Sequence, residues 1–257
     1  MKAFNMVCNY LIPNLSPVSR FFASNTKNLA HIERDCWSCL KRINCKTFIC
    51  ECGKIQSVSP HVNYFELFNF LPKMDINLRE LARQKRTLLQ SFHPDKFVRS
   101  SAEEMRISKL TTSFINDAYK VLSDPISRAE YILTLNGNEC SSKDVPITDP
   151  LFLNEILEMN EQVDELVDWI KQDTPSDKIQ CRIDDIHQSI ATQWDDELDN
   201  ISKFTEKEDW KSAQESIGRI RYYERLKQRL KDLIPEFSKR GLSIPRDLRG
   251  DRTRDIL

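Results

Sequence analysis

Residues 77–125 read NLRELARQKRTLLQSFHPDKFVRSSAEEMRISKLTTSFINDAYKVLSDP, and this stretch decides the fold. Its first part, residues 77–92, lacks Pro and Gly and repeats apolar residues at helical spacing. A proline disfavours the helical conformation at the residue before it, so this helix ends at His93-Pro94-Asp95. The tripeptide by itself is a weak signal, because it also suits an ordinary helix-ending turn.

A second helix is predicted to begin at Ser101. The pair Ser101 and Glu104 has the spacing of a capping box, in which each side chain satisfies an exposed backbone amide. The helical pattern continues to about Leu122. Asp124 and Pro125 then start a third helix, since a proline at the first helical position loses no hydrogen bond. The segment therefore predicts a helical hairpin with a short polar tip.

The first helix of this hairpin is basic, with Arg79, Arg83, Lys85 and Arg86 beside the tip. The whole chain of 257 residues has a formal net charge of −1, and 30% of its residues are charged. A protein that is basic throughout and wraps nucleic acid is therefore not expected. Electrostatic docking has to come from local patches such as this one.

Downstream of the hairpin, a polar linker at 138–149 precedes three further amphipathic patterns. These patterns cover residues 150–171, 177–204 and 208–234, each with apolar residues three and four apart. Short connections between them predict an antiparallel three-helix bundle. Residues 235–257 show no such period and are interpreted as a tail.

Some apolar residues of the first bundle helix miss its core stripe. At about 100° per residue, Leu153 and Leu157 lie well away from the centre of that stripe. Apolar residues that are exposed and bordered by acids suggest a protein-binding surface, although scattered surface leucines are also common. The surface considered comprises Leu153, Leu157, Glu158, Glu161, Glu165 and, from the third bundle helix, Tyr222.

Five of the eight cysteines fall between Cys36 and Cys52. Such a cluster in a chain otherwise poor in cysteine indicates a metal site in a reducing compartment. Cys36, Cys39 and Cys52 are three expected zinc ligands, and the fourth is Cys50 or, as the alternative, Cys45. Four protein ligands leave no open position, so the zinc would serve folding or docking. A redox Cys-x-x-Cys would need a βαβ pattern that is not visible. The module is placed at 33–58.

Residues 1–32 contain no Asp or Glu, and Glu33 is the first acid. A basic, serine-containing leader without acids is typical of a mitochondrial transit peptide, which indicates a protein of the matrix. A disordered tail without meaning is the alternative. No stretch approaches the roughly 20 apolar residues of a membrane span, so a soluble protein without a membrane partner is expected.

The order of these motifs resembles that of a J domain, placed at residues 62–137. The resemblance rests on Tyr64-Phe-Glu-Leu-Phe, the basic helix, His93-Pro94-Asp95-Lys-Phe and the stretch from Ile115 to Pro125. Ile126-Ser-Arg-Ala-Glu-Tyr-Ile-Leu extends the resemblance to the HscB family, and Cys-Trp-x-Cys is similar to its metazoan mitochondrial members. Three features depart from the family pattern: Lys85 in place of an aromatic residue, the short second cysteine pair, and the tail after Leu230.

The resemblance implies an all-α protein, with a J-domain hairpin and a C-terminal three-helix bundle behind a small cysteine-rich zinc module. It implies a co-chaperone, not an enzyme, whose partners are a DnaK-type mitochondrial chaperone and an iron–sulfur cluster scaffold protein. By position, the chaperone would be contacted by His93, Pro94, Asp95, Arg79, Arg83 and Arg86. The scaffold would be bound by Leu153, Leu157, Glu158, Glu161, Glu165 and Tyr222.

Two other functions are open on the sequence. One is a J-domain co-chaperone with a different client. The other is a zinc-dependent nucleic-acid binder, which would need a basic face with aromatic residues near the cysteines. Lys41, Arg42, Lys46 and Lys54 offer charge there, but the rest of the chain does not extend it. No histidine stands in an arrangement typical of catalysis, and no phosphate-binding glycine loop is present.

Overall fold

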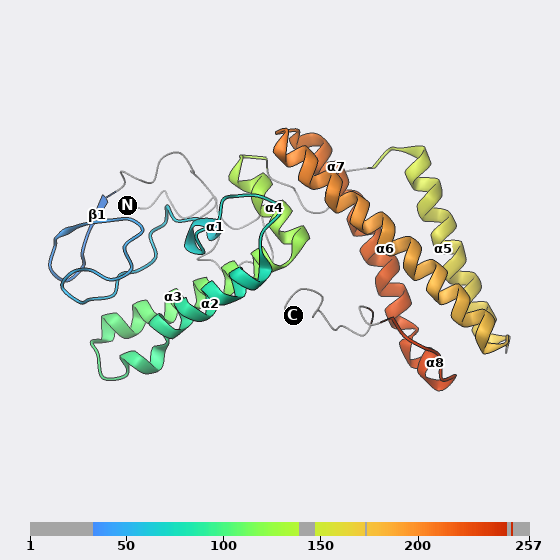
Figure 1. The fold of residues 1–257 in the computed structure, drawn as a ribbon, viewed down its shortest axis with the longest axis horizontal. Coiled ribbons are helices and arrows are strands. Elements are labelled where there is room, and N and C mark those ends of the chain that lie inside the picture. The colour runs from blue at the N-terminus through green and yellow to red at the C-terminus, as the bar shows by residue number, and fades with distance from the viewer. Residues whose placement is uncertain (1–32, 139–146, 173, 246–247, 249–257) are drawn as a thin grey trace, which may run out of the picture. The chain divides into compact units, whose positions relative to one another are not determined.

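The computed structural model describes residues 33–138, 147–172, 174–245 and 248 (Figure 1). The chain divides into two compact units, one ending at Ser142 and the other beginning at Lys143. Within the described residues both units are built mainly of helices, and strands occur only in the cysteine-rich segment. The predicted all-α class is therefore confirmed. No described helix is both long enough and apolar enough to cross a membrane.

The cysteine-rich segment contains two short hairpins. β1 (Glu33–Asp35) and β2 (Arg42–Asn44) form the first as an antiparallel pair. The second runs from Phe48 to Gln56 and is called the 48–56 hairpin below. It is closed by the Gln56 N–H, which donates to the Phe48 carbonyl at 2.8 Å. Gly53 in its turn has φ +80°, a backbone conformation that residues with a Cβ rarely adopt.

A short helix, α1 (Tyr64–Leu67), supplies much of the aromatic core of the first unit. The Tyr64 ring stacks on the Tyr131 ring with centroids 4.5 Å apart. The backbone N–H of Tyr64 donates to the Tyr131 hydroxyl at 3.0 Å, so this phenol is buried with a partner. A capping box between Asn63 and Glu66 fixes the start of the helix.

The helical hairpin predicted from residues 77–125 is present. Its elements are α2 (Leu78–Phe92), the 3-10 turn η3 (Pro94–Phe97), α3 (Ala102–Ser123) and α4 (Pro125–Leu135). The capping box of Ser101 and Glu104 and the cap at Asp124 are both confirmed. The carbonyl of Phe92 accepts from the hydroxyl of Ser108 at 2.7 Å, which ties the end of α2 to α3.

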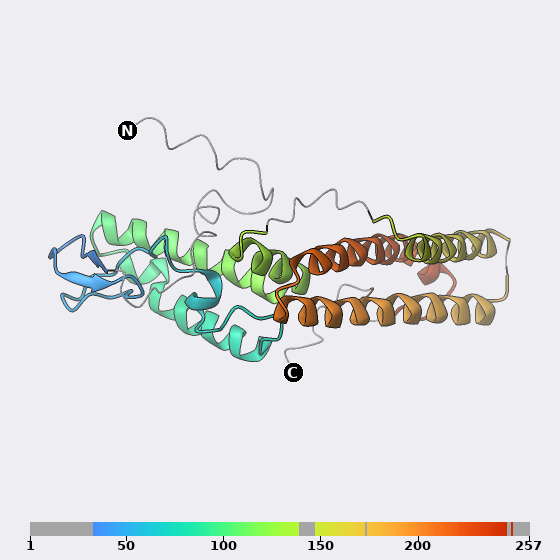
Figure 2. The same cartoon turned by 90° about the horizontal axis from the view of Figure 1, so that it is seen from above.

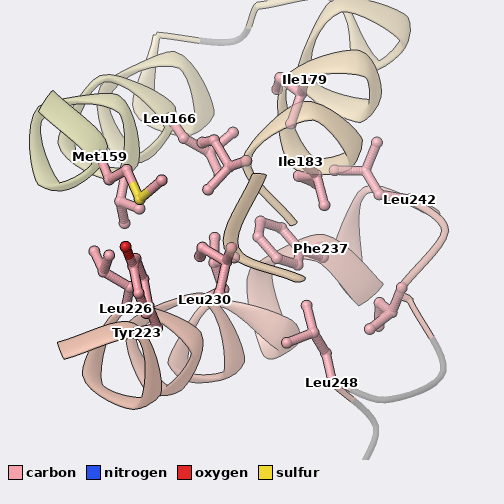
Figure 3. Packing of buried hydrophobic residues seen from close by; sticks show 14 of the residues in the cluster. Met159, Leu166, Ile179, Ile183, Tyr223, Leu226, Leu230, Phe237, Leu242 and Leu248 are labelled. Atoms are coloured by element: carbon pink, nitrogen blue, oxygen red, sulfur yellow. The ribbon is translucent and has the colours of Figure 1, made fainter. Parts of the chain in front are cut away.

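The second unit is a bundle with one element more than predicted. Its helices are α5 (Pro150–Lys171), α6 (Ser176–Glu206), α7 (Trp210–Asp232) and the short α8 (Ile234–Lys239). The three long helices lie alongside one another, and successive ones run in opposite directions (Figures 1 and 2). Met159, Leu166, Ile183, Tyr223 and Leu230 meet in the core between them (Figure 3).

The segment after residue 234 was interpreted as a tail, and for its described part the structure corrects this. The side chains of Phe237, Leu242 and Leu248 are buried in the core of the bundle (Figure 3), and so is that of Ile244. Their spacing is neither that of a helix nor that of a strand, and for this reason the sequence pattern does not identify them as core residues.

Candidate functional site

His93, Pro94 and Asp95 form the turn that joins α2 to α3. His93 has extended backbone dihedrals, φ −60° and ψ 129°, which is the conformation that a following proline favours. Its Nδ1 accepts from the backbone N–H of Asp95 at 3.3 Å and lies 3.5 Å from the Asp95 carboxylate. The side chain of His93 is 54% exposed and that of Asp95 is 87% exposed. The tip is therefore presented to solvent with its own local bracing.

The basic surface of α2 lies next to this tip. Arg79, Arg83 and Arg86 are all exposed, and their spacing of four and three residues places them on one face of the helix. Arg83 forms two hydrogen bonds with the Glu80 carboxylate, at 2.7 and 2.6 Å, which lower the pKa of that carboxyl. Part of the charge of Arg83 is thus already balanced within the chain.

Lys85 is on α2 but does not join this surface. Its ammonium lies 4.0 Å from the centroid of the Tyr119 ring, in a cation–π contact. The side chain is half-buried between α2 and α3. The lysine side chain therefore packs against Tyr119 at a position where the family pattern has an aromatic residue.

The first unit brings four cysteines together. The sulfurs of Cys36, Cys39, Cys50 and Cys52 all lie within 4.8 Å of one another. The Cys36–Cys52 distance is 3.8 Å and the Cys39–Cys50 distance is 3.7 Å. Four sulfurs at about 2.3 Å from a tetrahedral zinc lie about 3.8 Å apart, whereas a disulfide would need about 2.05 Å. The geometry fits four ligands of one metal ion. Cys45, the alternative ligand, is buried outside this group.

The pKa values of the cysteine thiols are also consistent with a site for a cation. Burial opposes ionisation of Cys36, but the N–H groups of Cys39 and Ser38 and the thiols of Cys39 and Cys50 together lower its pKa to about 6. The N–H of Cys52 favours the Cys50 thiolate, but burial and the other three sulfurs raise the pKa of Cys50 to about 12. Four thiolates can coexist here only when a positive charge lies between them.

A third candidate surface lies on the outer side of α5. Leu153 is 41% exposed and Leu157 is 57% exposed, in contrast to the buried stripe of the same helix. Glu158, Glu161 and Glu165 are exposed on this side, and Glu165 pairs with Arg182 of α6. Tyr222 of α7 is half-buried, and its ring contacts Phe152 edge-on at 5.6 Å. The six residues predicted as one client surface are therefore accessible in whole or in part.

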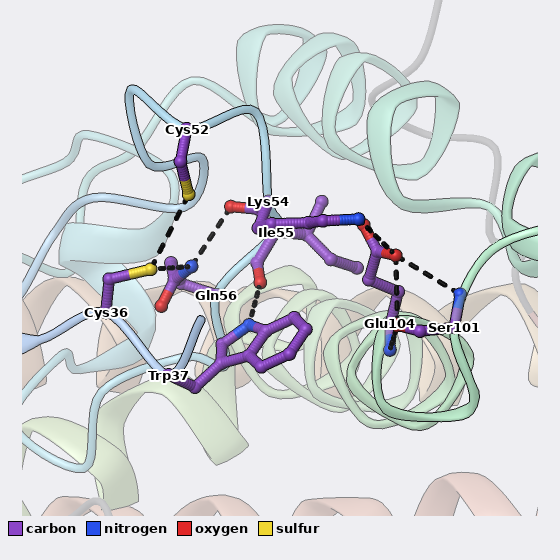
Figure 4. Close-up of polar contacts among 8 residues, drawn as sticks. All are labelled: Cys36, Trp37, Cys52, Lys54, Ile55, Gln56, Ser101 and Glu104. Atoms are coloured by element: carbon purple, nitrogen blue, oxygen red, sulfur yellow. Dashed lines mark hydrogen bonds and ion pairs between the residues drawn. The ribbon is translucent and has the colours of Figure 1, made fainter. Parts of the chain in front are cut away.

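Sequence patterns missed two contacts that link the cysteine segment to the helices on either side of the tip. The Phe48 ring packs edge-on against Phe92, with centroids 5.6 Å apart. The Lys54 ammonium lies 3.0 Å from the Glu104 carboxylate, a contact between residues 50 positions apart (Figure 4). The contacts join residues that are 44 and 50 positions apart, so the spacing of neighbouring residues in the sequence does not predict them.

Comparison with known proteins places the chain in one family. The family model described as HSCB C-terminal oligomerisation domain matches residues 148–231. The Co-chaperone protein HscB homolog of Shewanella woodyi is 33% identical over 181 residues, covering 68% of this chain and all of the relative. The homologue of Vibrio vulnificus is 29% identical over 175 residues, covering 68% of this chain and 98% of the relative.

Solved structures agree with these relatives. The crystal structure of human co-chaperone protein HscB superposes with a TM-score of 0.68 at 28% identity, covering 79% of this chain and 100% of the human chain. Chaperone HscB from Vibrio cholerae superposes with a TM-score of 0.61 at 26% identity, covering 68% and 99%. Sequence, fold and arrangement of the candidate sites point the same way, and the chain belongs to the HscB co-chaperone family.

Proposed function

We propose that this protein is a J-domain co-chaperone that stimulates ATP hydrolysis by a DnaK-type chaperone and brings an iron–sulfur cluster scaffold to it. The observation that carries the proposal is the exposed His93-Pro94-Asp95 tip on a rigid hairpin beside an arginine surface. This arrangement occurs in a chain of the HscB family, whose relatives are named co-chaperones.

The protein itself supplies no catalytic group in this proposal, because hydrolysis takes place in the partner. Arg79, Arg83 and Arg86 would meet an acidic surface of the chaperone, where complementary charge sets orientation and association rate. His93 and Asp95 would then contact the chaperone directly. Their mutual hydrogen bond reduces the conformational freedom that binding has to remove.

The two other surfaces complete the adaptor. Zinc held by Cys36, Cys39, Cys50 and Cys52 would stabilise the N-terminal module and take no part in chemistry. The scaffold protein would dock on α5 at Leu153 and Leu157, with the acidic residues at the border of the contact. We place the protein in the mitochondrial matrix on the composition of residues 1–32, which lie outside the described residues. Sequencing of the N-terminus of protein isolated from mitochondria would test this location.

The first prediction tests the tip. His93→Gln removes the imidazole from an exposed turn, so it should abolish stimulation of the partner's ATPase without changing the helical circular dichroism. The measurement is the steady-state ATPase rate of a DnaK-type chaperone with increasing amounts of the variant.

The matched control is His61→Gln, the same chemical change at another exposed histidine of the first unit. It should stimulate like the wild-type protein. If His93→Gln also stimulates at the wild-type level, the assignment of the tip is wrong.

A further inference from the structure

The 48–56 hairpin touches both ends of the segment that carries the tip. Phe48, on its first strand, packs on Phe92, the last residue of α2. Lys54, on its second strand, pairs with Glu104 in the first turn of α3. The segment 93–101, which contains His93-Pro94-Asp95, lies between these two contacts. One small hairpin therefore fixes the positions at which the tip segment begins and ends.

The contact at Glu104 lies within the cap of α3. Glu104 is 5% exposed, and its carboxylate accepts from the Ser101 N–H at 3.2 Å and the Ser101 hydroxyl at 3.0 Å (Figure 4). The same oxygen meets the Lys54 ammonium, which lowers the pKa of the carboxyl against the effect of burial. Loss of Lys54 would leave a nearly buried carboxylate without its cation, and such losses are costly.

The shape of the hairpin depends on the cysteines. Cys50 and Cys52 lie in its turn, where the Cys50 N–H donates to the Lys54 carbonyl at 3.0 Å and the Gly53 N–H donates to the Cys50 carbonyl at 2.8 Å. From the other half of the module, Trp37 Nε1 donates to the Ile55 carbonyl at 2.7 Å (Figure 4). The four sulfurs also bring the two halves of the module together.

Hydrogen bonds also join the two halves, among them those from Arg34 to the Thr47 and Ser57 carbonyls at 2.9 and 2.6 Å, but the apolar core of the module is small. Within the described residues its own buried apolar cluster consists of Cys36, Ile43 and Cys50, and two of these three are candidate ligands. A segment of about 25 residues with so small a core does not bury enough apolar surface to fold without help. Zinc binding would therefore supply much of the free energy that keeps the hairpin in place.

We propose that metal binding at Cys36, Cys39, Cys50 and Cys52 is thermodynamically coupled to the order of residues 93–101. Phe48 and Lys54 act as positioning residues that transmit the coupling through the 48–56 hairpin. The zinc module then stabilises the conformation of the tip that the chaperone binds. By linkage, an ordered tip segment increases the affinity for the metal by the same factor. The consequence for the chaperone rests on the proposed function, whereas the coupling itself does not.

Amide hydrogen exchange on the full chain tests the coupling. Suitable reporters are the amides of Lys96, Ser100 and Met105, whose N–H groups bond the carbonyls of His93, Phe97 and Ser101 at 3.0 Å each. Removing Zn²⁺ with a chelator should accelerate their exchange by about fivefold or more, the lower end of typical coupling free energies. Amides in the middle of α5 should be unaffected, because they belong to the other unit.

Two variants separate coupling from general damage. Phe48→Ala should keep one zinc per chain and yet show fast amide exchange at the reporters. Chelation should accelerate exchange in this variant only slightly further, because the metal acts on the reporters through Phe48. Lys54→Met should behave in the same way through the other end of the segment, even if Phe48→Ala fails to fold. Lys41→Ala, which removes an exposed ion pair within the module, should resemble the wild-type protein.

Three outcomes would overturn the proposal. The reporters could exchange at the same rate with and without Zn²⁺. Chelation could accelerate exchange in either variant by the same factor as in the wild-type protein. Alternatively, Lys41→Ala could accelerate exchange as much as Lys54→Met. A fourth result would be that the coupling is present but the protein stimulates no DnaK-type chaperone. This would contradict the proposed function and not the coupling between metal binding and residues 93–101.

Discussion

At the scale of single residues, Cys50 and Cys52 belong to the same group of four sulfurs although only Glu51 separates them. In an extended strand, residues two apart lie on the same face, about 6.5 to 7 Å from each other. Here the turn closed by the Gly53 N–H and the Cys50 carbonyl shortens that distance, and Gly53 supplies the positive φ that continues it. The unusual spacing is thus accommodated by the backbone without recruiting Cys45.

A second prediction follows for the ligands. Cys50→Ser should lose the metal, because its sulfur belongs to the group of four, whereas Cys45→Ser should keep about one zinc per chain. Elemental analysis of the purified proteins measures both, with Cys36→Ser as the variant expected to lose zinc on any assignment. Retention of zinc by Cys50→Ser together with its loss by Cys45→Ser would reverse the choice of the fourth ligand.

At the scale of elements, α5 has two apolar faces with different surroundings. One face, with Phe152, Ile156 and Met159, packs into the bundle core. The other carries Leu153 and Leu157, which remain exposed beside acidic residues. A helix that keeps exposed leucines at a spacing of four residues has the pattern with which helices meet protein partners. The second face of α5 is therefore the surface on which we expect the client.

A third prediction separates these faces. Leu153→Ala combined with Leu157→Ala should lower stability only slightly, since exposed substitutions usually stay within about 0.5 kcal/mol each. The buried Ile156→Ala should instead cost about 2–5 kcal/mol. At a binding hot spot the double variant should lose about 2 kcal/mol or more of affinity for the scaffold, roughly thirtyfold. Thermal melts and a pull-down of the scaffold measure both quantities.

Adding Tyr222→Ala tests the contribution of α7 to the same surface. Because the Tyr222 ring contacts Phe152, some loss of stability is expected from this change alone. The control is Leu71→Ala, an exposed leucine of the first unit, which should alter neither quantity. If the double leucine variant melts early, the two residues belong to the core. If it folds and still holds the scaffold, the client binds elsewhere.

At the scale of the whole molecule, the described residues 234–245 and Leu248 complete the second unit. Arg240 donates to the carbonyl of Ile170, in the last turn of α5, and to that of Thr174, between α5 and α6, at 3.1 Å. Gln180 and the backbone of Ser243 exchange two hydrogen bonds, at 3.1 and 2.7 Å. These contacts join the segment to the end of α5 and the start of α6, so its described residues stabilise the second unit.

A fourth prediction concerns this segment. Phe237→Ala should destabilise the bundle by about 3–5 kcal/mol, because its ring is fully buried in the bundle core. It should leave the zinc content unchanged, since the cysteines belong to the other unit. Denaturant unfolding followed by circular dichroism, with Phe237→Leu as the conservative change and the exposed Lys239→Ala as control, measures the effect. A wild-type midpoint for Phe237→Ala would show that the segment adds nothing to stability.

The sequence by itself determined the features that are encoded locally. The spacing of apolar residues predicted the hairpin and the three long helices, and the caps at Ser101 and Asp124 stand where their side chains predicted them. The position of His93-Pro94-Asp95 between two helices followed from the proline. Such features depend on residues within one or two turns of each other, so a pattern of neighbours is enough to identify them.

Only the tertiary structure decided the rest. It grouped Cys50, and not Cys45, with the other three sulfurs, placed Phe48 and Lys54 against the two ends of the tip segment, and buried Phe237, Leu242, Ile244 and Leu248. The contacts of Phe48 and Lys54 join residues 44 and 50 positions apart, and the buried residues after α7 follow no helical or strand period. Which distant side chains meet is set by how whole elements pack, and the stabilisation comes from surfaces that exist only after packing.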